Sequence, residues 1–119
     1  MSILWFTGNT GAGKSTIAER IAKNSGSIVL HGDNMRASIS CDLGLSKADR
    51  VENNWRIARL ANELDKAGHS VIVAVICPYQ SQRDAISAAF SVDFIYVPGG
   101  KEPCEEYPYE IPEAVERAV

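Results

Sequence analysis

The 119-residue sequence predicts an α/β fold in which helices cover both faces of a small parallel sheet. Short apolar stretches alternate with segments of helical periodicity, a pattern typical of strand–helix–strand units. One stretch, over residues 71–77, is an unbroken apolar run of mostly β-branched residues, which predicts a central strand buried on both faces. The length and the 45% hydrophobic content suit one core, so we expect residues 1–119 to form a single domain.

The first half of the chain predicts two strands, each followed by a helical segment. A buried strand over 3–7 leads through a Gly-rich loop into a helix over 14–24, whose apolar residues recur at i,i+4 and which ends at Gly26. A second short strand over 27–31 leads into a turn or short helix over 33–40. This order places the Gly-rich loop directly after a strand and before a helix.

The second half begins with the clearest helix. Ser46 and Asp49 form the pattern S-x-x-D, which is typical of a capping box, and the apolar periodicity that follows stops before Gly68. The remaining predicted elements are the strand over 71–77, a helix over 80–90, a strand over 94–97 and a short helix over 112–118.

Composition and charge exclude several functional classes. The net charge of −3 argues against a protein that coats nucleic acid or an anionic membrane, although a local basic site remains compatible with it. Neither apolar run, over 3–6 or 71–77, approaches the length of a membrane span. The three cysteines, Cys41, Cys77 and Cys104, show no C-x-x-C spacing, so we expect reduced thiols in the cytoplasm rather than a zinc site or a disulfide framework.

Residues 8–15 match the phosphate-loop pattern G-x-x-x-x-G-K-[ST] in full. Glycines let the backbone curl so that its N–H groups face phosphate oxygens. Lys14 adds a charge for the β- and γ-phosphates, and Ser15 offers its hydroxyl to Mg²⁺. A chance Gly-rich turn is the alternative, but the strand before and the helix after favour ATP binding. The predicted ATP site comprises Gly8, Asn9, Thr10, Gly11, Ala12, Gly13, Lys14, Ser15 and Thr16.

Asp33 is the candidate catalytic acid–base group. It follows the second strand directly, and the carboxyl ends of parallel strands are where ligands bind in such sheets. A carboxylate there could hold Mg²⁺ together with Ser15, or take a proton from an attacking hydroxyl. The alternative is a cap for a helix that begins near Asn34. The strand over 71–77 carries no terminal aspartate, which argues against a GTPase-like switch and leaves Asp33 as the candidate.

Arginines follow the second strand and are candidates for anion binding. Guanidinium groups suit phosphate or sulfate because they donate two parallel hydrogen bonds. Arg50 and Asn53 are spaced i,i+3 and therefore share a helix face, while Arg36 and Arg56 lie nearby in sequence. The alternative for each of them is an ordinary solvated arginine.

Several stretches together resemble the adenylylsulfate kinase family. They occur in order and at the family's spacing over most of the chain, which is far more specific than a phosphate loop alone. The matching stretches are GNTGAGKST (8–16), LHGDNMR (30–36), DLGLSKADRVEN (42–53), RIA (56–58) and VICPY (75–79) with Arg83, while PYE (108–110) with Pro112 and Glu113 resembles the end of that family's chain.

This resemblance implies a P-loop NTPase fold of three layers, α/β/α, with about four parallel strands in the order 2-3-1-4. It implies transfer of the ATP γ-phosphate, with Mg²⁺, to the 3′-hydroxyl of adenylylsulfate in sulfate assimilation. It places Asp33 and Lys14 at the catalytic centre, and it implies a homodimer. The implied acceptor-binding residues are Arg36, Arg50, Asn53, Pro78 and Tyr79.

The chain departs from the family pattern at three places. The family usually reads L-D-G-D-N where His31 stands here, so one acidic group near the metal is lost. Leu45 stands where the family has a phenylalanine that stacks on the substrate adenine. A lid segment rich in Arg and Lys, which carries a second aromatic ring, is reduced here to little more than Glu106 and Tyr107. The missing rings should cost stacking energy on the order of a few kcal/mol for this acceptor.

Two alternatives therefore stay open beside an adenylylsulfate kinase. A shortened, open site could admit another alcohol, such as a modified nucleoside or a hydroxymethylated DNA base, although the acidic net charge weighs against DNA. A nucleotide-binding module with decayed catalysis would bind ATP or ADP and transfer no phosphate.

Overall fold

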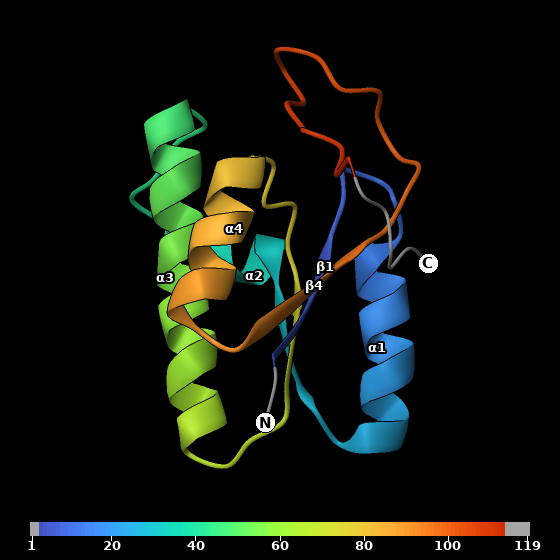
Figure 1. Cartoon of the computed structure of the whole chain (residues 1–119), viewed down its shortest axis with the longest axis vertical. Coiled ribbons are helices and arrows are strands. Elements are labelled where there is room, and N and C mark those ends of the chain that lie inside the picture. The colour runs from blue at the N-terminus through green and yellow to red at the C-terminus, as the bar shows by residue number, and fades with distance from the viewer. Residues whose placement is uncertain (1–2, 114–119) are drawn as a thin grey trace.

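The computed structural model describes residues 3–113, and its strands alternate with helices along the chain, with two helices in succession after the second strand (Figure 1). The strands are β1 (Ile3–Thr7), β2 (Ile28–His31), β3 (Val71–Ala74) and β4 (Val92–Tyr96). The helices are α1 (Lys14–Ser25), α2 (Gly32–Ala37), α3 (Lys47–Lys66) and α4 (Gln80–Ala89).

The four strands form one sheet in the order β2-β3-β1-β4, which confirms the predicted order. Every pairing between neighbours is parallel, with His31 opposite Ala74 and Thr7 opposite Tyr96 at the carboxyl ends. All four residues of β3 are buried, as its unbroken apolar sequence predicted. The loops that follow the strands consequently gather at one edge of the sheet.

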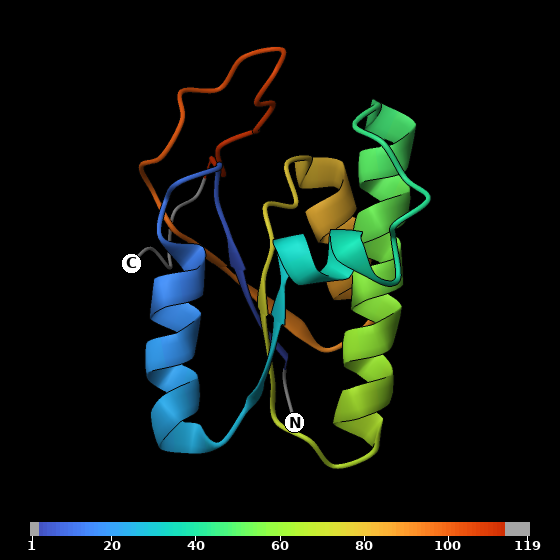
Figure 2. The same ribbon diagram turned by 180° about the vertical axis from the view of Figure 1, so that it is seen from behind.

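Helices cover both faces of the sheet and confirm the three-layer architecture. Helix α1 lies on one face, and α2, α3 and α4 lie on the other (Figures 1 and 2). Each face of the sheet has its own hydrophobic core, and successive side chains of β1 pack into opposite cores. Trp5 packs with α3 and α4, whereas Phe6 packs with Ala18 of α1. The indole N–H of Trp5 is satisfied by the carbonyl of Val75 at 3.1 Å.

One half of the predicted capping box at the start of the long helix is confirmed, whereas the Asp49 carboxylate accepts from the backbone N–H of Gly44 instead of that of Ser46. The Ser46 hydroxyl accepts a hydrogen bond from the backbone N–H of Asp49 at 3.1 Å, at the first turn of α3. Ile57 and Ala61 are fully buried against the sheet, and Gly68 just beyond the helix has a positive φ of 96°. This capped start fixes the register of α3, and with it the face that Arg50 and Asn53 occupy.

The predicted bounds of three strands differ from the observed ones, and for β2 the difference is the single residue Ser27. The strand predicted over 71–77 ends at Ala74, which is the last residue of β3 paired with its two neighbours, opposite Phe6 of β1 and His31 at the end of β2. Strand β4 covers Val92–Tyr96 instead of 94–97, because its pairing with β1 begins at Ile3 opposite Val92. The helix predicted over 112–118 falls largely outside the described residues.

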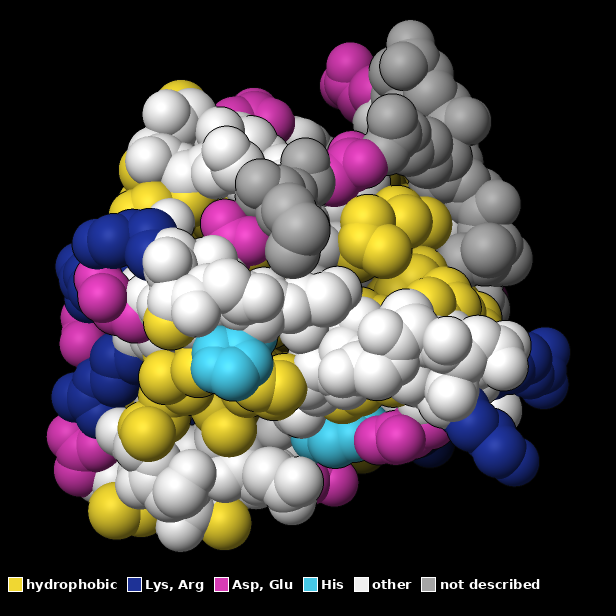
Figure 3. Space-filling model, turned by 90° about the horizontal axis from the view of Figure 1, so that it is seen from below, with side chains coloured by type: hydrophobic (Ala, Val, Ile, Leu, Met, Phe, Trp, Pro, Cys, Tyr) yellow, Lys and Arg dark blue, Asp and Glu magenta, His cyan; other side chains and the backbone are white. Residues whose placement is uncertain are grey.

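The described residues form no membrane-spanning helix. On the face in Figure 3, they also form no patch of a single charge. No helix among residues 3–113 is long and apolar enough to cross a membrane. Acidic and basic side chains alternate along one edge of the face in Figure 3 instead of gathering by sign.

Candidate active site

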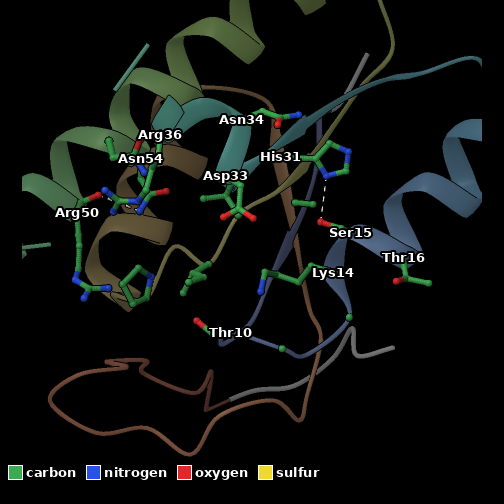
Figure 4. A pocket seen from close by; sticks show the side chains of 18 residues that line it. Thr10, Lys14, Ser15, Thr16, His31, Asp33, Asn34, Arg36, Arg50 and Asn54 are labelled. Carbon is green, nitrogen blue, oxygen red and sulfur yellow. Dashed lines mark hydrogen bonds between the residues drawn. The ribbon is translucent and has the colours of Figure 1, made fainter. Parts of the chain in front are cut away.

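A cavity of about 490 Å³ opens at the carboxyl ends of the strands. It lies between the phosphate loop with the start of α1 on one side and α2, α3 and the loop after β3 on the other (Figure 4). Of the predicted site residues, those lining it are Thr10, Gly11, Gly13, Lys14, Ser15, Thr16, Asp33, Arg36, Arg50, Asn53 and Pro78. The tertiary structure thus brings the phosphate loop, the candidate base and the arginines to one site.

The phosphate loop presents an open helix N-terminus to this cavity. Gly13 is the N-cap of α1 in the left-handed conformation, with φ 96°, and makes no side-chain cap. The first turn of α1 contains no acidic residue, so the positive end of the helix dipole is unopposed. The first backbone N–H groups of a helix lack intrahelical partners and readily bind an anion. This geometry fits the phosphates of a nucleotide.

Lys14 and Asp33 face each other across the cavity (Figure 4). Burial lowers the pKa of Lys14 from 10.5 to about 8, and the negative charge of Asp33 opposes part of that shift. The Lys14 ammonium donates to the backbone carbonyl of Asn9 at 3.0 Å, which holds it over the loop. A cation placed in this way lacks a strong anionic partner until phosphate binds.

Asp33 occupies the first turn of α2 rather than its cap position. The helix begins at Gly32, with His31 as the N-cap, so the cap predicted for a helix starting near Asn34 does not describe this residue. The Asp33 side chain is exposed to the cavity, and no other described residue forms a hydrogen bond or ion pair with it. Its carboxylate is therefore free to act on a ligand.

The far side of the cavity combines two cations with buried amides. Arg36 donates to the carbonyl of Gly44 at 3.0 Å, and Arg50 to the carbonyl of Leu45 at 2.8 Å. Neither forms a salt bridge with a carboxylate in the described part of the chain. Burial, followed by the nearby charge of Arg50, lowers the pKa of Arg36. The Asp49 carboxylate opposes part of that shift. Two neighbouring cations that form no ion pair within the described structure suit an anionic ligand.

Buried asparagines supply the polar contacts that a nucleotide would need. Asn53 and Asn54 line the cavity from α3, and the side-chain oxygen of each is buried with no hydrogen-bond partner in the described structure. Buried polar atoms normally find a partner, so these oxygens point to a ligand that donates hydrogen bonds. Asn54 was not among the predicted site residues, although a second asparagine inside an apolar helix face is a usable signal.

Four predicted residues do not line the cavity, and each has another contact. A Cβ on Gly8 would come within 2.4 Å of the Val97 carbonyl, so this glycine permits close packing against the end of β4. Ala12 packs in the core under α1. Tyr79 is the N-cap of α4, and the Lys47 ammonium lies over its ring. The fourth is Asn9. Arg56, also considered for anion binding, pairs instead with Asp42 and Glu52.

The side chain of Asn9 connects the phosphate loop by hydrogen bonds to segment 98–110, which follows β4. Its amide donates to the carbonyls of Lys101 and Tyr107 at 2.9 and 3.1 Å. The backbone N–H of Lys101 donates to the Thr10 carbonyl at 2.8 Å, and the Tyr109 hydroxyl lies 2.9 Å from that of Thr7. These hydrogen bonds thus hold the short segment 98–110 against the phosphate loop.

Replacing Gly100 with alanine is expected to weaken ATP binding by about tenfold or more, because local strain of this kind costs roughly 1–3 kcal/mol. An added Cβ would lie 2.5 Å from the Thr10 oxygen and 2.8 Å from the Ala12 nitrogen, so it would push on the phosphate loop. Calorimetric titration with Mg·ATP measures the effect.

Gly99→Ala is the matched control, because Gly99 also has a positive φ, 95°, but a Cβ there would meet no atom within 4 Å. Equal losses of affinity in the two variants would show that backbone strain, rather than contact with the loop, is responsible.

A parallel sheet in the order 2-3-1-4, with a phosphate loop after its first strand, defines the P-loop kinase class. The family model for adenylylsulphate kinase matches residues 1–116. The chain therefore belongs to the adenylylsulfate kinase family, as the resemblance predicted.

Relatives in sequence and structure agree with this assignment. The chain is 42% identical over 112 residues to an adenylyl-sulfate kinase of Lactiplantibacillus plantarum, covering 87% of this chain and 54% of the relative. It is 42% identical to that of Geotalea uraniireducens, covering 87% and 53%. The chain thus spans about half the length of these curated relatives. The Mycobacterium tuberculosis APS kinase in complex with AMPPNP and APS superimposes with a TM-score of 0.84 at 29% identity, covering 99% of this chain and 87% of that one.

Proposed function

We propose that this protein transfers the γ-phosphate of ATP to the 3′-hydroxyl of adenylylsulfate. The observation that carries the proposal is the arrangement of one cavity, with Lys14 at the phosphate loop, Asp33 opposite it, and the Arg36–Arg50 pair beyond Asp33. Such an arrangement suits a phosphate donor at one end and an anionic alcohol at the other. Family membership and the likeness to an APS kinase solved with APS support this choice of acceptor.

In the proposed reaction, Asp33 accepts the proton of the acceptor hydroxyl. The hydroxyl oxygen then forms a bond to the γ-phosphorus, and the bond from that phosphorus to the bridging oxygen breaks to release ADP. Lys14 and the first N–H groups of α1 bind the β- and γ-phosphates and stabilise the charge that develops on them. Arg36, Arg50 and Asn53 bind and orient the acceptor, with Pro78 at the edge of its site.

The residues present also fit a nucleotide-bound Mg²⁺. The Ser15 hydroxyl and the Asp33 carboxylate line the same cavity as Lys14, and Mg²⁺ bound with a nucleotide needs only one or two protein oxygens. The described residues contain no cluster of three acidic, histidine or cysteine side chains that could hold a metal without a nucleotide. When bound, Mg²⁺ neutralises phosphate charge.

The direct test is phosphate transfer from labelled ATP, with Mg²⁺, to adenylylsulfate, followed by mass analysis of the product. We expect 3′-phosphoadenylylsulfate to form. ATP binding without any phosphorylated product would overturn the proposed acceptor.

A second candidate is a kinase of another alcohol. The Leu45 side chain, where the family has an aromatic ring, is 66% exposed, so the acceptor end lacks a stacking surface at this position. Phosphorylation of a modified nucleoside, with no phosphorylation of adenylylsulfate in a parallel reaction, would favour this candidate. Tight ATP binding with no transfer to either alcohol would instead favour a non-catalytic nucleotide-binding protein.

Arg50→Gln is expected to raise the KM for adenylylsulfate by about ten- to hundredfold, the range for a lost hydrogen bond to a charged group. The KM for ATP should change much less, because Arg50 and the phosphate loop lie at opposite ends of the cavity. Initial rates with each substrate varied in turn measure the two constants.

Arg20→Gln on the exposed face of α1 is the control for this change of charge. An equal rise in both KM values in Arg50→Gln would contradict the assignment of Arg50 to the acceptor.

We further propose that residues 1–119 act as one domain, in a homodimer and in the cytoplasm. The single sheet, with one core on each face, supports the domain assignment. All three cysteines lie within the described residues and none forms a disulfide, which suits a reducing compartment. The homodimer follows from the family resemblance, and sedimentation of the purified protein tests it.

A further inference from the structure

His31 connects the end of β2 to α1 through both of its ring nitrogens. It is the last residue of β2, at the edge of the sheet where the cavity opens. Its Nδ1 lies 3.1 Å from the Ser15 Oγ, and its Nε2 lies 2.5 Å from the Glu19 Oε1 (the first contact is drawn in Figure 4). Ser15 and Glu19 are spaced i,i+4 on α1, so one helix face presents both partners to the imidazole.

The two partners determine which ring nitrogen carries the proton. An ionised carboxylate only accepts hydrogen bonds, so the Nε2 beside Glu19 must be the donor. In the neutral imidazole, Nδ1 then carries a lone pair directed toward the Ser15 hydroxyl. Histidines that bind metals typically donate their other N–H to a carboxylate in this way, which orients the ring and makes the ligating nitrogen more basic.

The spacing of Nδ1 and the Ser15 hydroxyl also suits two ligands of one ion. Adjacent ligands of an octahedral ion, each at about 2.1 Å, are roughly 3 Å apart. The observed separation is 3.1 Å. The Asp33 carboxylate lines the same cavity and could complete the protein's contribution. The His31 side chain is only 21% exposed, so its ring is held in place rather than free in solvent.

We propose that His31 Nδ1 is a direct ligand of the divalent ion that accompanies the nucleotide. Imidazole favours first-row transition ions, whereas Mg²⁺ favours oxygen ligands. The protein therefore prefers ions such as Mn²⁺ and Co²⁺ over Mg²⁺, relative to a chain with aspartate at this position. Glu19 is a positioning residue that acts through His31. This inference rests on the proposed binding of a metal–nucleotide complex at the phosphate loop.

The test detects nitrogen coordination directly. Mn²⁺ and the methylene analogue of ATP are added to the whole protein, and electron spin echo modulation of the bound ion is recorded. We expect modulation from a directly bound nitrogen, and labelling of the histidines alone with ¹⁵N should change it. The modulation should vanish in His31→Asp and persist in His69→Asn, because His69 is an exposed histidine in the turn before β3.

Binding titrations measure the consequence for ion preference. His31→Asp should reduce the preference for Co²⁺ over Mg²⁺, measured as the ratio of nucleotide dissociation constants, by about tenfold. Glu19→Ala should weaken the Mn²⁺ complex by a similar factor of about ten, because the ring loses its orienting carboxylate.

The outcomes separate this inference from the proposed function. A bound Mn²⁺–nucleotide complex without histidine-derived modulation would overturn the ligand assignment and leave the proposed kinase intact. Failure to bind the nucleotide with Mg²⁺, Mn²⁺ or Co²⁺ would overturn the proposed function itself, and the ligand assignment with it.

Discussion

Replacing Asp33 with asparagine is expected to lower kcat for phosphate transfer by about 10²–10⁴-fold, the usual contribution of a general base. Asparagine has nearly the same shape, but its amide cannot take the hydroxyl proton or carry the negative charge. The carboxylate forms no hydrogen bond with another described residue, so the substitution breaks no contact of the fold. ATP binding, measured by calorimetry, should persist.

Asp84→Asn is the matched control, because Asp84 is an exposed residue of α4 away from the cavity. Its carboxylate accepts from the Gln80 side chain at 2.9 Å, and an amide oxygen can accept the same bond. Full transfer activity in Asp33→Asn would show that Asp33 is not the base.

Replacing Lys14 with alanine is expected to weaken ATP binding by about ten- to hundredfold, the range for hydrogen bonds to a charged group. The rate of transfer should fall further, by roughly 10²–10³-fold, because the charge on the γ-phosphate loses its nearest cation. Lys23→Ala near the end of α1 removes an exposed cation and serves as the control. ATP affinity equal to that of the unmodified protein would contradict the role of the phosphate loop.

The lowered pKa of Lys14 adds a pH dependence to the same prediction. With a pKa of about 8, roughly half of the Lys14 side chains are uncharged near pH 8 before ATP binds. The phosphates favour the charged form and raise this pKa, so binding near pH 8 should take up about half a proton. ATP affinity should therefore fall as the pH rises above about 8. Calorimetry in two buffers of different ionisation enthalpy measures the uptake, which Lys14→Ala should abolish.

Lys14 also makes the stability of the folded chain depend on pH. This stability should rise with pH, whereas the ATP affinity should fall. Its folded pKa of about 8 lies below the unfolded value of 10.5, so the unfolded chain binds more protons between these two values. The free energy of unfolding contributed by this group therefore rises across that window. Thermal unfolding without nucleotide should show the rise in the unmodified protein and a smaller one in Lys14→Ala.

The fold and the phosphate-loop half of the site could be predicted from patterns of neighbouring residues in the sequence. The phosphate loop is contiguous in sequence, so its glycines, Lys14 and Ser15 define it without knowledge of the fold. Alternating strand and helix patterns predicted the parallel sheet, and the family resemblance added the strand order, which the structure confirms. The strand over 71–77 was predicted too long because apolar sequence alone does not reveal where neighbouring strands end.

The contacts that decide the chemistry of this site depend on tertiary structure. Asn9 reaches Tyr107 across 98 positions, and His31 reaches Ser15 and Glu19 from a different element. Arg36 and Arg50 converge only because α2 and α3 pack on the same face of the sheet. The sequence by itself predicted the class of chemistry, because the phosphate loop that indicates it is formed by neighbouring residues. Only the tertiary structure decided how the proposed metal and acceptor ends of the cavity come together, because side-chain directions at strand ends follow from packing.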